Sequence, residues 1–202
     1  MTRKIDPHIG HSYWSDGLRG FKVLILGESS YNPNGYPDTY DISKQCSHLI
    51  RDVIGWDDYR QKGMFYSRVT RILGFDPKTK EARIDFWSRV SYCNYLQVIL
   101  SRPREMPSGE AWINGRQPFV QTVRELKPDY VLVFSKRLWP HLLKSDDVSI
   151  ESKSGTYARQ ARFEHDDASV TQVLNFKHPS SRGFAWQRIR EVLDTTVPGL
   201  CG

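Results

Sequence analysis

The chain has 202 residues, of which 39% are hydrophobic and 26% charged, and this length suits one globular domain over residues 1–202. Its formal net charge is +6, with Lys and Arg spread along the chain, and such a surface favours polyanionic partners without requiring one. No apolar run approaches the roughly 20 residues of a membrane-spanning helix and the amino terminus lacks the apolar stretch of a signal peptide, so we expect a soluble, cytoplasmic monomer.

The strongest predicted element is a buried strand over residues 21–26, which carries five bulky apolar side chains. Such a run is typical of a strand covered on both faces in a parallel sheet. Residues 1–20 form a lead-in whose bulky side chains can cover one edge of the core, namely Tyr13, Trp14 and Leu18. After the strand, residues 32–38 are rich in Pro, Gly and Asn and predict a loop rather than a continuing helix.

Apolar side chains at helical spacing predict the helices. These are expected from about residue 43 to 54, at 65–73, at 118–126, from 135 to 143 and at 184–193. Gly74 and Pro77 end the second helix, and Lys127-Pro128 separates the third from a second buried strand at 129–134.

The remaining stretches are less regular. Residues 84–90 fit a helix or a strand, and residues 91–97 fit a strand that passes into a loop. The polar residues 144–170 are expected to form a hairpin or a mobile excursion at the edge of the sheet, before another strand at 169–175. The alternation of strands and helices predicts an α/β fold, a three-layer α/β/α sandwich with a mostly parallel central sheet.

Polar side chains gather where three of the predicted strands end. The segments are Gly27-Glu-Ser-Ser-Tyr31, Tyr92-Cys-Asn94 and His178-Pro-Ser-Ser-Arg182. In open α/β sheets, ligands bind outside the carboxyl ends of the strands. The three segments therefore predict one site at that edge of the sheet.

In order and character, these segments resemble the uracil-DNA glycosylase superfamily. In that family a motif of the kind Gly-Gln-Asp-Pro-Tyr or Gly-Glu-Ala-Pro-Gly follows the first core strand. An Asn at the end of a later strand pairs with the flipped base, and a His-Pro-Ser loop completes the site and presses into the minor groove. The resemblance covers about residues 21–193, and residues 127–134 also look like the family's penultimate core segment.

The sequence departs from the family pattern at the first motif and in the loop. Ser29 stands where the family's water-activating Asp or Asn falls, whereas Glu28 matches the Glu of the Gly-Glu-Ala-Pro-Gly branch. Arg182 occupies the wedge position that is often Leu, which is similar to the single-strand-selective branch with its His-Pro-Ser-Pro-Arg.

The resemblance implies a DNA glycosylase that works without a metal or an organic cofactor. Glu28 is the first candidate for holding the water, with Asp38 or Asp41 as stand-ins for the missing carboxylate. Asn94 would read the base edge, because an amide offers both a donor and an acceptor. His178 would donate to a base carbonyl oxygen or bind a phosphate.

Further side chains would hold the base and the strand. Aromatic faces tolerate any nucleobase, so the candidates for stacking are Tyr31, Tyr36 and Tyr40. Ser180 and Ser181 would clamp phosphates, Arg182 would fill the gap left by the flipped nucleotide, and Arg102 and Arg104 would track the backbone. The Ser29-Ser30 pair is small, which makes room for a base larger than uracil. Some prokaryotic members of the superfamily excise hypermodified bases from phage DNA, so the resemblance implies a modified cytosine, hydroxymethylated or glucosylated, as the expected substrate.

Plainer interpretations stay open. Glu28 can cap a helix or pair with a neighbouring Arg, and the arginines of the 101–109 loop can form a solvated face. The odd cysteine count, without Cys-x-x-Cys spacing, argues against a disulfide framework and a zinc site, and Cys93 has no obvious His partner for a catalytic thiol. Alternatives to the expected substrate are uracil or a damaged base. Alternatives in function are a non-catalytic DNA-binding module of the same fold and an α/β hydrolase that uses Ser29 or Ser30 with His178.

Overall fold

The computed structural model describes residues 3–32, 35–55, 63–142 and 158–202. Its centre is a six-stranded sheet in the order β1-β4-β2-β6-β8-β7. The strands are β1 (His8–Ile9), β4 (Ser91–Asn94), β2 (Val23–Gly27), β6 (Tyr130–Val133), β8 (Val170–Asn175) and β7 (Arg159–Glu164). The four inner strands are parallel, and the strand at each edge runs antiparallel to its neighbour. A separate parallel pair joins β3 (Ser30–Tyr31) to β5 (Ile99–Leu100).

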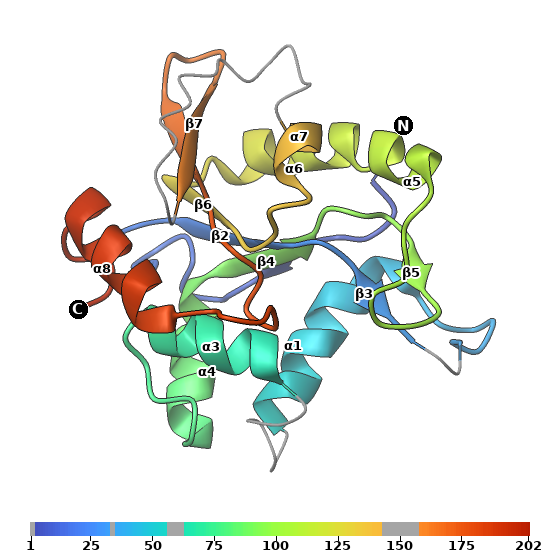
Figure 1. Ribbon diagram of the computed structural model, residues 1–202, viewed down its shortest axis with the longest axis horizontal. Coiled ribbons are helices and arrows are strands. Elements are labelled where there is room, and N and C mark those ends of the chain that lie inside the picture. Colours follow the sequence, from blue (N-terminus) through green and yellow to red (C-terminus); the bar gives the residue numbers. More distant parts are fainter. Residues whose placement is uncertain (1–2, 33–34, 56–62, 143–157) are drawn as a thin grey trace.

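Helices cover both faces of the sheet (Figure 1). One face carries α5 (Gly109–Asn114), α6 (Arg116–Leu126) and α7 (Trp139–Leu142). The other carries α1 (Gln45–Gly55), α3 (Met64–Ile72) and α4 (Lys80–Arg89), and α8 (Trp186–Thr196) packs against α3. The predicted α/β class with a mostly parallel sheet between helical layers is confirmed. Within the described ranges, no helix combines the length and the apolar character needed to cross a membrane.

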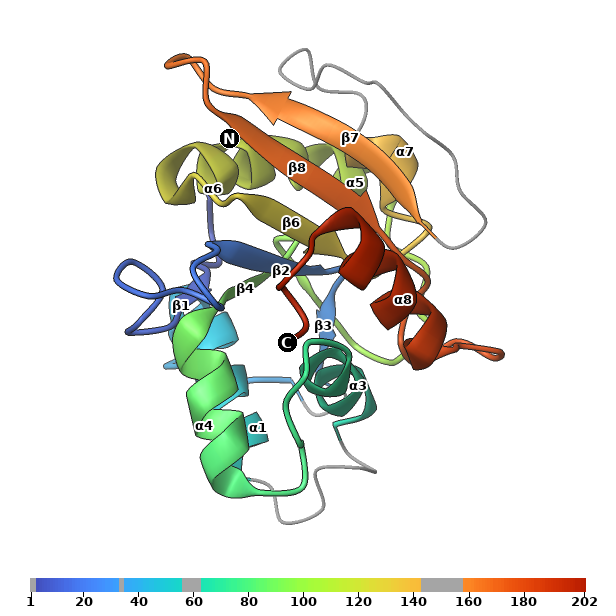
Figure 2. The same cartoon turned by 90° about the vertical axis from the view of Figure 1, so that its left-hand side faces the viewer.

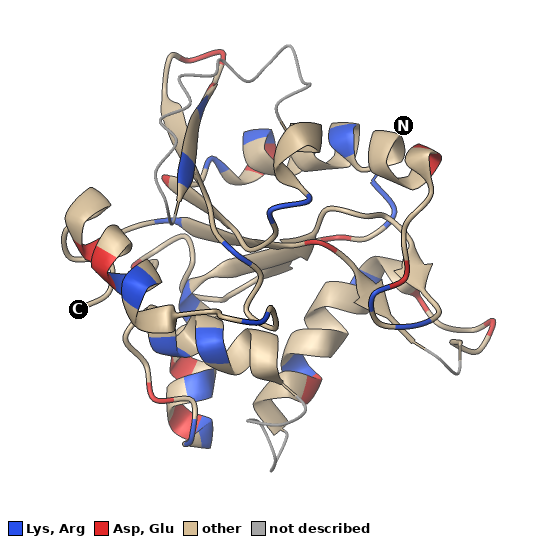
Figure 3. Cartoon of the chain, in the orientation of Figure 1, with Lys and Arg blue, Asp and Glu red and all other residues tan. Residues whose placement is uncertain are grey.

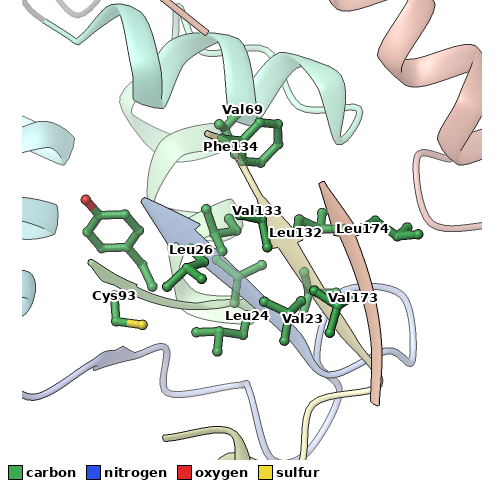
Figure 4. Packing of buried hydrophobic residues seen from close by; sticks show 14 of the residues in the cluster. Val23, Leu24, Leu26, Val69, Cys93, Leu132, Val133, Phe134, Val173 and Leu174 are labelled. Carbon is green, nitrogen blue, oxygen red and sulfur yellow. The ribbon is translucent and has the colours of Figure 1, made fainter. Parts of the chain in front are cut away.

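Strand β2 forms the centre of the core because its side chains are buried on both faces. All of its residues are buried, and it pairs in parallel with β4 on one side and with β6 on the other. Figure 4 shows Leu24 and Leu26 of this strand packed with Leu132 and Val133 of β6. The continuous apolar run at residues 21–26 therefore predicted this strand correctly.

The structure resolves the ambiguous stretch before β4 as a helix followed by a strand. Helix α4 begins at Lys80, where the Thr79 hydroxyl caps it by accepting a hydrogen bond from the Ala82 N–H at 3.3 Å. It ends at Arg89, because the backbone of the next residue, Val90, is extended, and β4 starts at Ser91.

The helix predicted over residues 135–143 is much shorter, since α7 covers only Trp139–Leu142. Residues 136–138 form a turn instead. The turn directs the Ser135 and Arg137 side chains toward Glu28, where they make the contacts described below. The prediction of a full helix after β6 was therefore wrong at its start.

The polar stretch before β8 belongs to the sheet. Strand β7 pairs antiparallel with β8 along its whole length, and Figure 2 shows the two side by side. Its burial alternates, with Ala161 and Phe163 inside, as expected for an edge strand with one face on the core. The hairpin alternative is thus confirmed for residues 159–175, and residues 143–157 lie outside the described residues.

The lead-in contributes to the core more than predicted. Its residues His8–Ile9 pair with β4, and Tyr13 and Leu18 are fully buried. Trp14, by contrast, is 57% exposed and meets Tyr13 edge-on. Its predicted core role is wrong because the preceding Tyr13 takes the inward position, with its hydroxyl donating to the Leu126 carbonyl at 3.3 Å.

Candidate functional site

The carboxyl ends of the parallel strands meet at one edge of the sheet and carry two connected hollows. We call them the inner pocket, of about 440 Å³, and the basic groove, of about 650 Å³. The residues that line both are Glu28, Ser29, Tyr31, His178 and Ser180. The first and last strand-end segments therefore meet at the junction of the two hollows, and Asn94 of the middle segment lines the inner pocket.

The inner pocket has aromatic walls around a polar end. Helix α3 supplies Met64, Phe65 and Tyr66, none of which the sequence marked as more than core. Tyr92 of β4 and Leu49 of α1 add further apolar surface. A hollow that combines an apolar wall with converging polar groups can hold a small molecule or a base.

Asn94 lies in a hydrogen-bonded series of side chains, here called the Asn94 network. Its Nδ2 donates to the Ser30 hydroxyl at 2.6 Å, and that hydroxyl donates to Gln45 Oε1 at 3.1 Å. Its Oδ1 accepts from the Tyr92 hydroxyl at 3.0 Å, which lies 3.2 Å from the Tyr66 hydroxyl. Burial raises the pKa of Tyr92, so this hydroxyl stays protonated and can donate. The amide of Asn94 is thereby held in place with one N–H and one lone pair left for a ligand.

Gly27→Ala tests the placement of Asn94. A Cβ at this position would lie 2.4 Å from Asn94 Oδ1 and 3.3 Å from the Tyr92 hydroxyl, so the buried amide must move. We expect the variant to lose both hydrogen bonds of Asn94 and about 1–3 kcal/mol of unfolding free energy, measured by urea denaturation.

Gly109→Ala is the matched control for this substitution. A Cβ there meets no atom within 4 Å, so we expect stability to be unchanged or slightly raised. Equal stability of the two variants would contradict the tight fit of Asn94 against Gly27.

Glu28 follows β2 and is buried between two polar side chains of the β6–α7 turn. Its Oε2 accepts from the Ser135 hydroxyl at 2.6 Å and from Arg137 Nε at 3.2 Å, and its Oε1 forms an ion pair with Arg137 Nη2. The alternative interpretation, a Glu28–Arg pair, is therefore confirmed. A carboxylate accepts about four hydrogen bonds, so one position on Oε1 remains for a water.

His178 also lines the junction, with its ring 5.5 Å from that of Phe65. Its Nδ1 accepts from the Ser180 backbone N–H at 3.1 Å, which leaves the proton of the neutral ring on Nε2. Burial lowers the pKa of His178; the Glu28 charge acts to raise it and the Arg137 charge to lower it further. The site thus holds a neutral imidazole that can donate from Nε2.

The basic groove is lined by cationic side chains from three loops, which follow β5, follow β6 and join β8 to α8. Figure 3 colours the ribbon blue at Lys and Arg positions in these loops. These residues are Arg102, Arg104, Lys136, Arg137, Lys177 and Arg182. Ser180 and Ser181 line it too. The structure therefore brings together all five predicted DNA contacts. Lys136, Arg137 and Lys177 were missed, because isolated basic residues next to strands carry no signal of their own.

The two carboxylates proposed as stand-ins do not line either hollow. Asp41 caps a short 3-10 helix, Ile42–Lys44, where it accepts from the Ser43 N–H at 3.1 Å and pairs with Lys44. Asp38 is exposed on the preceding loop. The Asp41 side chain stabilises a local turn and the Asp38 side chain faces solvent. Glu28 is the carboxylate that the structure places at the junction.

The three predicted stacking tyrosines occupy different positions. Tyr36 lines the inner pocket, and Tyr40 stacks behind it at 3.9 Å with an interplanar angle of 16°, outside the pocket lining. Tyr31 is 54% exposed and lines both hollows. Tyr31 and Tyr36 are therefore the two that a ligand can reach.

The geometry gives no support to a serine or cysteine nucleophile. The Ser30 hydroxyl donates to Gln45, and His178 Nδ1 is used by its own loop. Cys93 is buried, and its burial raises the pKa of the thiol and keeps it unreactive. Among the described residues, no group of three His, Cys, Asp or Glu side chains could hold a metal ion.

Comparison with known proteins assigns the chain to no family: no family model matches it, and neither does any curated protein. What the site can do must therefore be argued from the inner pocket and the basic groove.

Proposed function

We propose that the protein is a DNA glycosylase of a uracil-DNA glycosylase-like fold, which flips a base out of DNA and hydrolyses its N-glycosidic bond. The observation that carries the proposal is the junction at Glu28 and His178 between a base-sized pocket and a basic groove. An extruded base needs a pocket that encloses it, and the phosphates on either side of that base need a basic groove.

The reaction places positive charge on the sugar and negative charge on the departing base. Asn94 holds the polar edge of the base, and the His178 Nε2–H donates to a base carbonyl oxygen as negative charge builds there. Glu28 positions the attacking water through the free position on Oε1 and stabilises the sugar cation with its charge. Phe65 and Tyr36 form the aromatic walls for the base.

The strand lies along the basic groove in this proposal. Arg102, Arg104 and Lys177 contact its phosphates, with Ser180 and Ser181 as hydrogen-bond donors. Arg182, which is exposed at the same groove, fills the gap left by the flipped nucleotide.

The pocket volume supports a substrate larger than an unmodified pyrimidine. The inner pocket of about 440 Å³ opens into the basic groove, so a substituent on a bound pyrimidine has room beside the ring. Together with the family resemblance, this room leads us to propose a hypermodified cytosine of phage DNA as the substrate, with a hydroxymethyl or glucosyl group, and a role in antiviral defence. Uracil or a damaged base is the alternative.

A second candidate function is a non-catalytic DNA-binding module of the same fold. The observation that favours it is the engagement of Glu28 by Ser135 and Arg137, which is also how a purely structural carboxylate is held. The module would bind DNA through the same basic groove.

Formation of abasic sites distinguishes the two. The protein is incubated with DNAs that contain uracil, damaged bases, hydroxymethylcytosine or its glucosylated form, and the products are cleaved with alkali. We expect strand breaks with one modified-cytosine substrate. Breaks with uracil alone would keep the glycosylase and replace its substrate, whereas DNA binding without any breaks would favour the binding module.

A further inference from the structure

Arg137 belongs to both parts of the site. Its side chain is 45% exposed on the wall of the basic groove, whereas the Glu28 side chain that it contacts is only 9% exposed. Two of its nitrogens, Nε and Nη2, are on Glu28, and Nη1 lies 3.7 Å from the Met106 sulfur. The guanidinium therefore faces a carboxylate on one side and the groove on the other.

The groove around Arg137 is strongly cationic. Five other basic residues line it, and the carboxylates in its lining are Glu28 and Glu105. A guanidinium can bind either a carboxylate or a phosphate through two parallel N–H···O hydrogen bonds. A phosphate that enters the groove thus competes with Glu28 for Arg137.

Ser135 can hold the Glu28 side chain in place while Arg137 moves to a phosphate. Its hydroxyl donates to Glu28 Oε2 at 2.6 Å, independently of Arg137. If Arg137 leaves, Oε2 keeps this bond and Oε1 becomes free.

We propose that Arg137 exchanges Glu28 for a phosphate of the bound strand, so that Glu28 becomes fully available only when nucleic acid occupies the groove. The role of the released carboxylate rests on the proposed function, but the exchange itself requires only a polyanion. The free protein then holds its reactive carboxylate masked.

Binding of a fluorescent oligonucleotide tests the exchange, with anisotropy measured between about 50 and 200 mM salt. Glu28→Gln removes the competitor and frees Arg137, so we expect tighter binding. In the complex of the unmodified protein Arg137 already contacts the phosphate, so Glu28→Gln should leave the slope of log K against log salt unchanged. Arg137→Gln loses that contact and should make the slope shallower by about 0.7 to 0.9, so its loss of affinity across this salt range should be about threefold smaller. Arg137→Gln should also weaken binding, and in that background Glu28→Gln should bring no more affinity than Glu105→Gln does.

Glu105→Gln is the matched control, because it removes the same charge from the same groove. Its carboxylate accepts from the Ser101 hydroxyl at 2.7 Å and from backbone N–H groups, so its removal frees no arginine. We expect a small gain in affinity that is equal with and without Arg137. If Arg137→Gln disturbs the fold, Arg137→Lys replaces it in the test. This variant keeps the charge but loses the two-pronged geometry, so it should preserve part of the Glu28→Gln effect.

The proposal is overturned if Glu28→Gln binds no more tightly than Glu105→Gln, or if its additional affinity persists without Arg137. Absence of oligonucleotide binding in the unmodified protein overturns it as well. A positive result without any base release would support the exchange while removing the glycosylase, so the two proposals fail separately.

Discussion

Glu28→Gln should lower the rate of base release by roughly two to four orders of magnitude. Glutamine has nearly the same shape and can still accept from the Ser135 hydroxyl, so the pocket should stay intact. It lacks the negative charge that orients the water and stabilises the sugar cation. The measurement is the single-turnover rate of abasic-site formation on the substrate that the panel identifies.

Glu105→Gln serves as the control here too, because this carboxylate lies in the groove but away from the inner pocket. Its rate should stay close to that of the unmodified protein. A Glu28→Gln enzyme with nearly full activity would show that the water is positioned by another group, and the mechanism given above would be wrong.

His178→Ala should slow base release by about two to three orders of magnitude, the usual cost of losing one donor to a developing oxyanion. The rate should also fall at low pH. Protonation of Nδ1 breaks the hydrogen bond from the Ser180 N–H, and the pKa at which this occurs is lowered below the ordinary 6.5, mainly by burial. We therefore expect an acid limb below pH 6.5 that is absent from the residual activity of the variant.

The same pKa change affects stability, with a definite sign. A histidine whose folded pKa is lowered binds fewer protons folded than unfolded, so its contribution is complete above pH 6.5 and is lost as the pH falls below it. Burial also lowers the pKa values of His8 and His165, so the informative quantity is the difference in the pH dependence of stability between the protein and His178→Ala. NMR titration of the ring gives the pKa directly, and a value above 6.5 would contradict the structure.

The sequence predicted those elements whose burial leaves a continuous or periodic apolar pattern. Strand β2 and the helices α1, α3 and α6 are of this kind. The two-residue strands β1, β3 and β5 were missed because two residues carry no periodicity. The start of α7 was placed too early because the apolar pattern of residues 135–143 does not reveal that Ser135 and Arg137 turn toward Glu28.

The part of the candidate site that lies at strand ends could be predicted, because the carboxyl ends of parallel strands meet at one edge of the sheet. That rule placed Glu28, Asn94 and His178 at one edge, and the structure brings them to adjoining hollows. It could not identify Gln45 or Phe65, because both lie on amphipathic helices whose sequence indicates only core packing. Asp38 and Asp41 were chosen by nearness in sequence, which does not determine where a loop side chain points.

The Asn94 network has a directional property that bears on what the inner pocket can recognise. From Tyr66 through Tyr92, Asn94 and Ser30 to Gln45, each hydroxyl or amide passes its hydrogen to the next in one sense. With Asn94 turned over alone, the single Ser30 hydrogen would face two acceptor oxygens, and with Gln45 turned over alone, Ser30 would face two N–H donors, so either change leaves one donor or acceptor of the network without its partner. The other arrangement in which every such group is paired reverses every member at once. The Asn94 network therefore has two hydrogen-bond arrangements and changes between them as a whole. In one arrangement the Gln45 amide has its N–H groups left to donate, and in the other it has its carbonyl oxygen left to accept.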